Sequence, residues 1–253
     1  MRELRGSSPL RRVAAILDEL AVSQSGLSLS DISSRLGLPM PTAHRMLKSL
    51  CEIGYTTGGG GRARYRLGSR LLTLFQMTLS LNALRSLAAP ILQPLADRFD
   101  ATIFMTRLVQ GEIQLAGTVV PSRSSRSVVN PGREFPLNAT ASAKAIMAFQ
   151  EPEAIERALD EEHRQYRPRT VTDPRKLRSR LAEVRRKGYD INDDEYDAGV
   201  YSAACPIRIG DAGVIYAVGL VAFRERFLQE FTPAEMIAAL KRAAERLARA
   251  LQG

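Results

Sequence analysis

Two side chains, Ser142 and Lys144, have the residue types of a serine nucleophile and a lysine base in this chain of 253 residues. Such a pair must lie within hydrogen-bonding distance. Two positions apart on a helix, however, side chains point in different directions. A Ser-His-Asp triad would instead have to use His163, which lies in a polar stretch. We therefore predict no catalytic residue and interpret Lys144 as a surface or helix-end charge.

A cluster of acidic residues between positions 190 and 197 offers oxygen ligands for a hard cation. Its members are Asp190, Asp193, Asp194, Glu195 and Asp197. Their spacing is not that of an EF-hand loop, and a solvated acidic turn is the favoured interpretation. Two histidines and two distant cysteines form no zinc cluster, and the glycines at 58–61 lack the Gly-Lys-Ser/Thr that completes a phosphate-binding loop. The sequence predicts neither a metal nor a cofactor.

Positive charge is concentrated in the first third of the chain. The whole chain has 36 Lys and Arg side chains against 27 Asp and Glu, a net charge of +9, of which residues 1–81 contribute +6. Such a basic segment attracts a polyanion. The apolar run 212–223 is shorter than the ~20 residues that cross a bilayer, and two distant cysteines predict no disulfide framework. We expect a cytoplasmic, nucleoid-associated protein with no membrane partner.

Three helices are predicted in the basic N-terminal part. Pro9 suits the first turn of a helix whose apolar residues recur every three or four positions. Ser28, followed three residues later by an acid, has the spacing of a capping box that opens a second helix, and Gly37 ends that helix. After a short turn a third helix runs from Pro41 to Glu52, because proline is well suited to a first turn. The order is that of a helix-turn-helix.

The third helix has the two faces of a helix that enters the major groove of DNA. Its apolar residues recur at helical spacing, and Thr42, Arg45 and Lys48 lie opposite them. We expect Thr42 and Arg45 to contact base edges, and Lys48 to contact phosphate. The segments 54–57 and 62–67 predict a basic hairpin, or wing, that adds further phosphate contacts. The predicted DNA contacts are Met40, Pro41, Thr42, His44, Arg45, Lys48, Arg62 and Arg64.

Sequence stretches along nearly the whole chain resemble the IclR-type family of bacterial transcription regulators. They are Leu29–Pro39, Pro41–Leu50, Arg64–Leu71, Phe135–Ala145 and Glu195–Pro206. The resemblance implies a winged helix-turn-helix in residues 1–68, a linker helix in 69–82 that pairs two subunits, and a GAF-like effector-binding domain in 83–253. An ordinary buried helix is the alternative for the linker. Because Met40 and Pro41 replace polar residues common in the family, Thr42 and Arg45 would carry more of the base readout, or Met40 would meet a thymine methyl.

Mixed helices and strands place the C-terminal part in the α+β class. Strands are expected at 102–109, 113–120, 200–209 and 214–222, and helices at 84–99, about 139–149, 173–188 and 233–251. The resemblance implies a central antiparallel sheet with an effector cavity over one face.

The family resemblance also implies which residues contact the effector. They are Phe135, Ala141, Ser142, Asn192, Val200, Ser202, Gly219 and Val221. Compared with members that bind small keto acids, Gly219 would add room and Val221 would remove a hydrogen-bond donor. We expect a small organic or aromatic acid that is larger or more apolar than a two- or three-carbon acid.

The leading hypothesis for function is a transcription regulator, expected to act as a repressor. It would bind double-stranded operator DNA as a homodimer or a dimer of dimers, and its effector would shift the protein between arrangements that fit the operator differently. Two alternatives are a nonspecific architectural DNA binder, for which the large C-terminal part would be unexplained, and an enzyme tethered to DNA, which would need the catalytic pair that the residues do not form.

Overall fold

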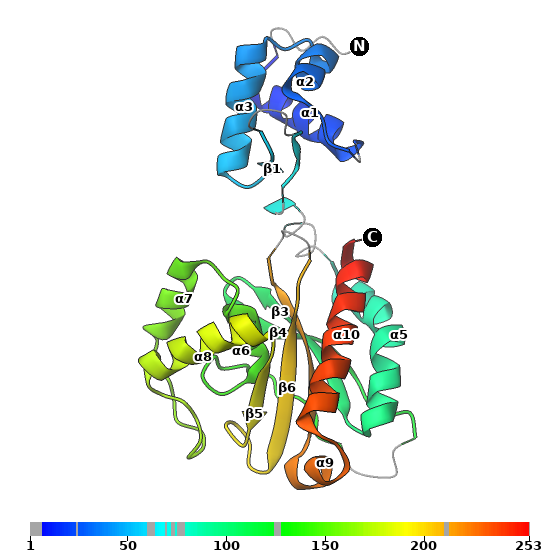
Figure 1. Cartoon of the computed structure of the whole chain (residues 1–253), viewed down its shortest axis with the longest axis vertical. Coiled ribbons are helices and arrows are strands. Elements are labelled where there is room, and N and C mark those ends of the chain that lie inside the picture. The colour runs from blue at the N-terminus through cyan, green and yellow to red at the C-terminus, as the bar shows by residue number, and fades with distance from the viewer. Residues whose placement is uncertain are drawn as a thin grey trace. The chain divides into compact units, whose positions relative to one another are not determined.

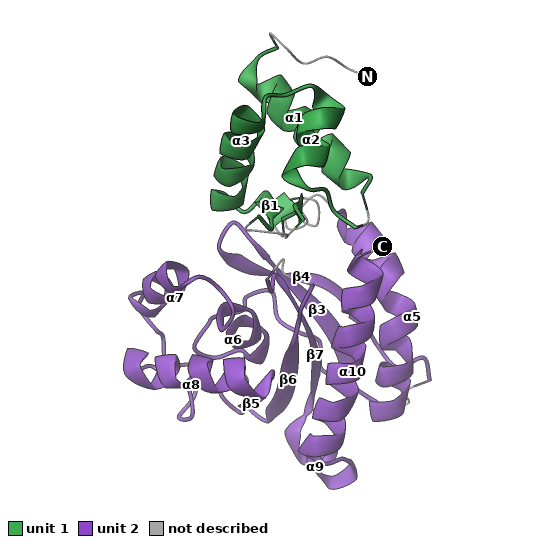
Figure 2. Cartoon of the chain, turned by 45° about the horizontal axis from the view of Figure 1, so that its top comes forward, with its two compact units in different colours: residues 1–78 green, residues 79–253 purple. Residues whose placement is uncertain are grey.

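The structure is a computed structural model that describes residues 7–23, 25–59, 64–68, 70–71, 74, 79–123, 128–209 and 213–252. The chain divides into two compact units, residues 1–78 and residues 79–253 (Figure 2).

In its described residues the first unit has a three-helix core and a short hairpin, with further helical residues at 70, 71 and 74. Its elements are α1 (Pro9–Ala21), α2 (Leu29–Leu36), α3 (Met40–Glu52), β1 (Thr56–Thr57) and β2 (Arg66–Leu67). The predicted capping box is confirmed, because the Ser28 hydroxyl accepts from the Asp31 amide and the Asp31 carboxylate accepts from the Ser28 amide. Gly37 ends α2 in the left-handed region at φ 61°. Local hydrogen bonds therefore set the two ends of α2 where the sequence places them.

The described part of the hairpin is short. Thr56 and Thr57 pair with Leu67 and Arg66, and residues 60–63, which include the start of the predicted second strand, lie outside the described residues. Tyr65 forms its backbone hydrogen bonds with Leu27 instead, at 2.8 and 2.9 Å. The returning segment is thus held by the connection between α1 and α2 before it reaches β1.

The second unit is built on one five-stranded antiparallel sheet. Its strands are β3 (Thr102–Val109), β4 (Glu112–Val119), β5 (Asp190–Asp193), β6 (Val200–Ile207) and β7 (Tyr216–Phe223), in the order β4-β3-β7-β6-β5. Gln110 and Gly111 join β3 to β4 with positive φ values of 52° and 89°, as a two-residue hairpin turn requires. The predicted α+β class and central antiparallel sheet are confirmed.

Helices cover both faces of this sheet (Figure 1). They are α5 (Leu81–Phe99), α6 (Ala141–Met147), α7 (Pro152–Leu159), α8 (Pro174–Lys187), α9 (Arg224–Glu230) and α10 (Pro233–Gln252). α5 and α10 pack together on one face, and α6 packs on β6 and β7 from the other face with α8 behind it. The apolar side chains of β6 and β7 are buried on both faces for this reason. Among the described helices, none is long and apolar enough to span a membrane.

The sequence analysis missed three short elements, α7, β5 and α9. Each has eight residues or fewer, too few to show a clear hydrophobic period. α5 also begins earlier than predicted, because the Ser80 hydroxyl caps it by accepting from the Ala83 amide. Leu81 and Asn82, the last residues of the expected linker 69–82, therefore lie in α5, and most of the remaining linker lies outside the described residues.

Candidate DNA-binding face and effector cavity

The third helix of the first unit, α3, has a buried apolar face and an exposed polar face. Ala43, Leu47 and Leu50 are buried in the core of this unit. Arg45 and Lys48 are exposed on the other side, and within the described parts of the chain neither forms an ion pair. Uncompensated cations on a protruding helix can bind phosphates and base edges.

The first turn of α3 is less polar than its middle. Met40 is 47% exposed, Pro41 and His44 are exposed, and Thr42 is half-buried. Four of the predicted contacts therefore lie on the accessible surface or at its margin, and their contact with DNA stays a prediction. A thioether at this position can meet a thymine methyl but can accept no strong hydrogen bond from a base.

Arg64 is held by the protein more firmly than a simple phosphate contact would need. Its Nη1 donates to the Gly26 carbonyl at 2.7 Å, and its Nη2 lies 3.8 Å from the Asp31 carboxylate. A Cβ at Gly26 would lie 2.6 Å from the Tyr65 carbonyl oxygen, so only glycine fits there. Arg64 thus anchors the wing to the loop before α2. Its phosphate contact stays a prediction, and Arg62 lies outside the described residues.

A cavity of about 40 Å³ lies in the second unit between the sheet, the start of α6 and residues 129–135. It is lined by seven of the eight predicted effector residues, namely Phe135, Ala141, Ser142, Asn192, Val200, Ser202 and Val221. The volume is far below the ~300 to 1,000 Å³ of usual ligand sites. An effector therefore requires side chains of the cavity to move.

Gly219, the eighth predicted residue, does not line this cavity. It faces Phe104 across β3 and β7, and a Cβ at Gly219 would lie 2.4 Å from Cζ of the Phe104 ring. Gly219 makes room for the Phe104 ring and does not itself line the cavity, so its effect on an effector stays a prediction. Phe104 lines the cavity and lies 6.4 Å from Phe135 between ring centroids, so the two form an aromatic wall. The sequence analysis missed Phe104 because the register between β3 and β7 is not visible in a sequence.

Two polar residues of the cavity differ in their hydrogen bonding. The Ser142 hydroxyl is buried and has no hydrogen-bond partner among the described residues. Both ends of the Asn192 amide are hydrogen-bonded, since its Nδ2 donates to the Ala139 carbonyl at 2.7 Å and its Oδ1 accepts from the Glu195 amide at 2.9 Å. An unpaired buried hydroxyl is unfavourable unless a ligand or a water satisfies it. Of these two residues, Ser142 is the one with an unused hydrogen-bonding group for a ligand.

The buried position of Lys144 contradicts two interpretations made from the sequence. It is fully buried, with its Nζ 3.1 Å from the Asp190 carboxylate and 2.5 Å from that of Glu195, and Arg180 Nε donates to Asp190 at 2.6 Å. Lys144 is not a surface charge, and the acidic segment is not simply a solvated turn. The reason is β5, which carries Asp190 into the sheet so that the turn after it places Glu195 against α6.

The carboxylates of this acidic segment have different environments. Burial raises the pKa of Glu195, which the neighbouring Lys144 opposes. The hydrogen bond from Arg224, by contrast, lowers the pKa of Asp193. Among the described residues no group of three or more His, Cys, Asp or Glu side chains is placed to hold a metal ion.

Comparison with protein families identifies the chain. The model of the IclR helix-turn-helix domain matches residues 9–58, and that of the C-terminal part of IclR-type bacterial transcriptional regulators matches residues 76–249. The chain belongs to the IclR family. Like its relatives, this IclR-family protein is a DNA-binding transcription regulator rather than an enzyme.

Individual relatives agree with the family assignment. The IclR-family chain is 32% identical to the glycerol operon regulatory protein of Streptomyces coelicolor, over 98% of this chain and 97% of the relative. It is 29% identical to the transcriptional regulator Rv1719 of Mycobacterium tuberculosis, with 88% and 85% of the two chains covered. A solved IclR homologue from Microbacterium hydrocarbonoxydans, in complex with 4-hydroxybenzoate, is 28% identical and superposes with a TM-score of 0.59 over 97% of this chain and 99% of its own.

Two further residues of this IclR regulator join the candidate DNA-binding face. Ser49 is exposed on α3 one turn after Arg45, and Arg66 is exposed on β2. The sequence analysis did not select either residue. Helical spacing could have found Ser49, since positions four apart share a face.

Proposed function

We propose that this IclR-family regulator is a repressor that reads operator half-sites with α3 and responds to a small organic acid bound in its second unit. The exposed face of α3 supports the first part, with Thr42 and Arg45 as base-reading residues and Lys48, Arg62 and Arg64 on phosphates. Reading two half-sites requires two copies of the chain. A homodimer or dimer of dimers, paired through the linker segment 69–82, would provide them.

An aromatic acid is the effector class that the cavity favours. The observation that carries this proposal is the unpaired Ser142 hydroxyl beside the wall of Phe104 and Phe135. A ring can stack on such a wall while its polar substituent satisfies the hydroxyl. The 4-hydroxybenzoate complex of the Microbacterium homologue supports the same class.

A neutral polyol is a second candidate, and the charges at the cavity favour it. Its charged lining residues among those described are two acids, Glu134 and Asp197. These would repel a carboxylate, whereas Ser142 and Ser202 could bind hydroxyl groups. The Streptomyces relative is named a glycerol operon regulatory protein, which supports this alternative.

Thermal unfolding with a panel of compounds separates the two effector classes. We expect 4-hydroxybenzoate to raise the midpoint of the second unit, and glyoxylate, pyruvate and glycerol to leave it unchanged. Ser142→Ala should reduce the shift, while Ser179→Ala on the exposed face of α8 should not. Stabilisation by glycerol alone would favour the polyol, and stabilisation by glyoxylate or pyruvate but not by aromatic acids would contradict the proposed class.

Footprinting of the region upstream of the chain's own gene tests the DNA-binding part. A promoter fragment should compete better than random DNA, with protection of two half-sites. Equal competition by random DNA would indicate an architectural binder instead. Sedimentation of the full chain should give a dimer or tetramer, and a monomer would contradict the proposed pairing.

A further inference from the structure

A second hollow in the C-terminal unit has a strongly basic lining. It has a volume of about 610 Å³ and lies where β6 runs past the end of β5, between α10 and the C-terminal end of α8. It shares no residue with the effector cavity. Five of its lining side chains are basic and only Glu245 is acidic. We call this surface the basic hollow.

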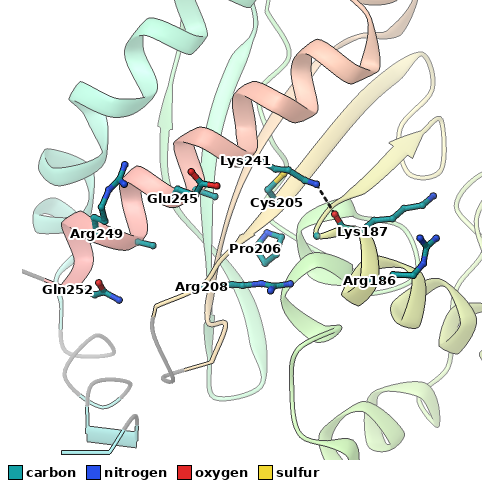
Figure 3. Close-up of a pocket in the computed structure, with 12 residues that line it drawn as sticks. Arg186, Lys187, Cys205, Pro206, Arg208, Lys241, Glu245, Arg249 and Gln252 are labelled. Carbon is teal, nitrogen blue, oxygen red and sulfur yellow. Dashed lines mark hydrogen bonds between the residues drawn. The ribbon is translucent and has the colours of Figure 1, made fainter.

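The cations come from three elements that meet at the hollow. Arg186 and Lys187 end α8, Arg208 follows β6, and Lys241 lies on α10. Figure 3 shows Lys241 and Arg208 on either side of Pro206, with both side chains extending toward α8. The basic last turn of α8 by itself could be explained by the helix dipole. Arg208 and Lys241 belong to other elements, so that explanation does not apply to them.

Two of these cations are held in place without a carboxylate partner among the described residues. Lys241 Nζ donates to the Lys187 carbonyl at 2.8 Å and lies 5.2 Å from the centre of the Tyr189 ring. The Arg208 guanidinium lies 4.5 Å from the centre of the Phe149 ring. A carbonyl and aromatic faces orient a cation without neutralising it. Lys187 is the exception, because it pairs with Glu183.

Other arginines of the same unit are paired with carboxylates. Arg180 bonds to Asp190, Arg224 to Asp193, and Arg178 to Glu156. In the described part of the chain, Arg186, Arg208 and Arg249 have no such partner. Among the described residues, Arg208, Arg249 and Lys241 therefore lie at the hollow without an ion-pair partner, whereas Glu183 pairs with Lys187 and lies near Arg186.

The floor of the basic hollow is apolar and carries no negative charge. It includes Pro206, Ala244 and the buried Cys205, whose pKa burial raises to about 12, so that the thiol stays neutral. The volume lies within the ~300 to 1,000 Å³ of small-molecule sites.

We infer that the basic hollow binds a small phosphorylated metabolite that carries a diphosphate group. An excess of several positive charges is matched by a ligand with several negative charges, and the guanidinium of Arg208 offers the planar donor fork that phosphate oxygens accept. Lys241 would supply a point charge beside it. The effector cavity is not needed for this binding.

Titration calorimetry of the full chain with inorganic pyrophosphate and ADP, in buffer with 150 mM salt, tests this inference. We expect one site per chain, and at least a tenfold loss of affinity in the double variant Arg208→Gln/Lys241→Gln. Both side chains are exposed, so the variant should fold, which its thermal midpoint can verify. The matched control is Arg157→Gln/Lys176→Gln, which removes two exposed charges elsewhere and should bind pyrophosphate normally.

Three outcomes would overturn the proposal. They are no heat of binding up to millimolar pyrophosphate, equal affinity in the hollow variant and the wild type, or loss of pyrophosphate binding in Lys48→Ala, which would place the anion on α3. Operator binding by the hollow variant separates the sources of phosphate. It should be unchanged if the ligand is a metabolite, and a loss would assign the hollow to the DNA backbone instead.

Discussion

At the scale of single residues, Arg45 and Lys48 illustrate how one helix face can hold two functions. Both are exposed on α3 and carry the same charge. Arg45 has a planar donor fork that can bind a guanine edge, whereas Lys48 offers a point charge that suits a phosphate. Their substitutions should therefore have different signatures.

We expect Arg45→Ala to relax sequence preference at one operator position, at a cost of ~1 to 3 kcal/mol for the cognate site. Lys48→Ala should weaken all sequences alike and reduce the salt dependence of binding by about one phosphate contact. Anisotropy titrations with the operator, single-base variants and random DNA at several salt concentrations measure both effects. If Arg45→Ala weakened all sequences alike and Lys48→Ala relaxed the preference at one position, Lys48 would be the base-reading residue and Arg45 the phosphate contact.

Gly219 leads to a second prediction at this scale. Gly219→Ala places a Cβ against the Phe104 ring, at 2.4 Å from Cζ, and 2.9 Å from the Ala203 carbonyl. The ring must then move toward the cavity, and we expect effector binding to weaken together with a loss of ~1 to 3 kcal/mol in stability. The double variant Phe104→Leu/Gly219→Ala should recover part of the lost stability, because a smaller side chain relieves the contact with the added Cβ. Unchanged binding in Gly219→Ala would show that Phe104 does not limit the cavity.

At the scale of elements, the buried charges of Lys144, Asp190 and Glu195 join α6 to β5 and the turn after it. Asn192 connects the same turn to the effector cavity, because it bonds to the Glu195 amide and the Ala139 carbonyl. A ligand that moves the start of α6 would therefore disturb this cluster.

Replacing Lys144 should be strongly destabilising, because the buried Glu195 carboxylate loses its nearest cation and Asp190 keeps only Arg180. We expect Lys144→Met to lower the free energy of unfolding by about 3 to 5 kcal/mol, measured by urea denaturation. Lys176→Met, which removes an exposed lysine of α8, should have little effect. A loss below 1 kcal/mol would show that the cluster contributes little to stability.

The loss of stability in Lys144→Met should depend on pH in a defined direction. The folded-state pKa of Glu195 is already raised by burial, and loss of Lys144 removes a cause that lowers it. A carboxyl group whose pKa is raised in the folded state stabilises the fold at pH values below its pKa in the unfolded state, which is near 4.5 here. This stabilisation is lost as the pH rises through the pKa of the folded state. The deficit of Lys144→Met should therefore be larger at pH 8 than at pH 5. Adding Glu195→Gln to this variant should reduce the difference between its stability deficits at pH 8 and pH 5.

At the scale of the whole molecule, regulation requires that effector binding by the second unit and operator binding by the first unit change each other's free energy. If the effector changes operator affinity by some factor, the operator must change effector affinity by the same factor. We expect this equality when operator titrations with and without effector are compared with calorimetric effector titrations with and without operator. In Ser142→Ala, the change of operator affinity caused by the effector and the change of effector affinity caused by the operator should both be lost. A change of operator affinity without the reciprocal change would show that the compound acts elsewhere.

The sequence by itself determined the elements that depend on local interactions. The capping box at Ser28, the left-handed end at Gly37 and the two faces of α3 each rest on residues within a few positions of one another. The β3–β4 hairpin is equally local, with its turn at Gln110 and Gly111. Collinear motifs added the family, and with it seven of the sixteen residues that line the candidate effector cavity.

Only the tertiary structure decided the partners of residues far apart in the chain. Arg64 meets Gly26 across 38 positions, and Lys144 meets Glu195 across 51. Phe104 fills the space above Gly219 because two strands pair in one register out of several. Hydrophobic spacing indicates which face of a strand is buried, but it does not say which residue of a distant strand lies opposite, because that depends on how whole elements pack. The α3 face was therefore visible in the sequence, whereas the buried lysine, the aromatic wall and the basic hollow were not.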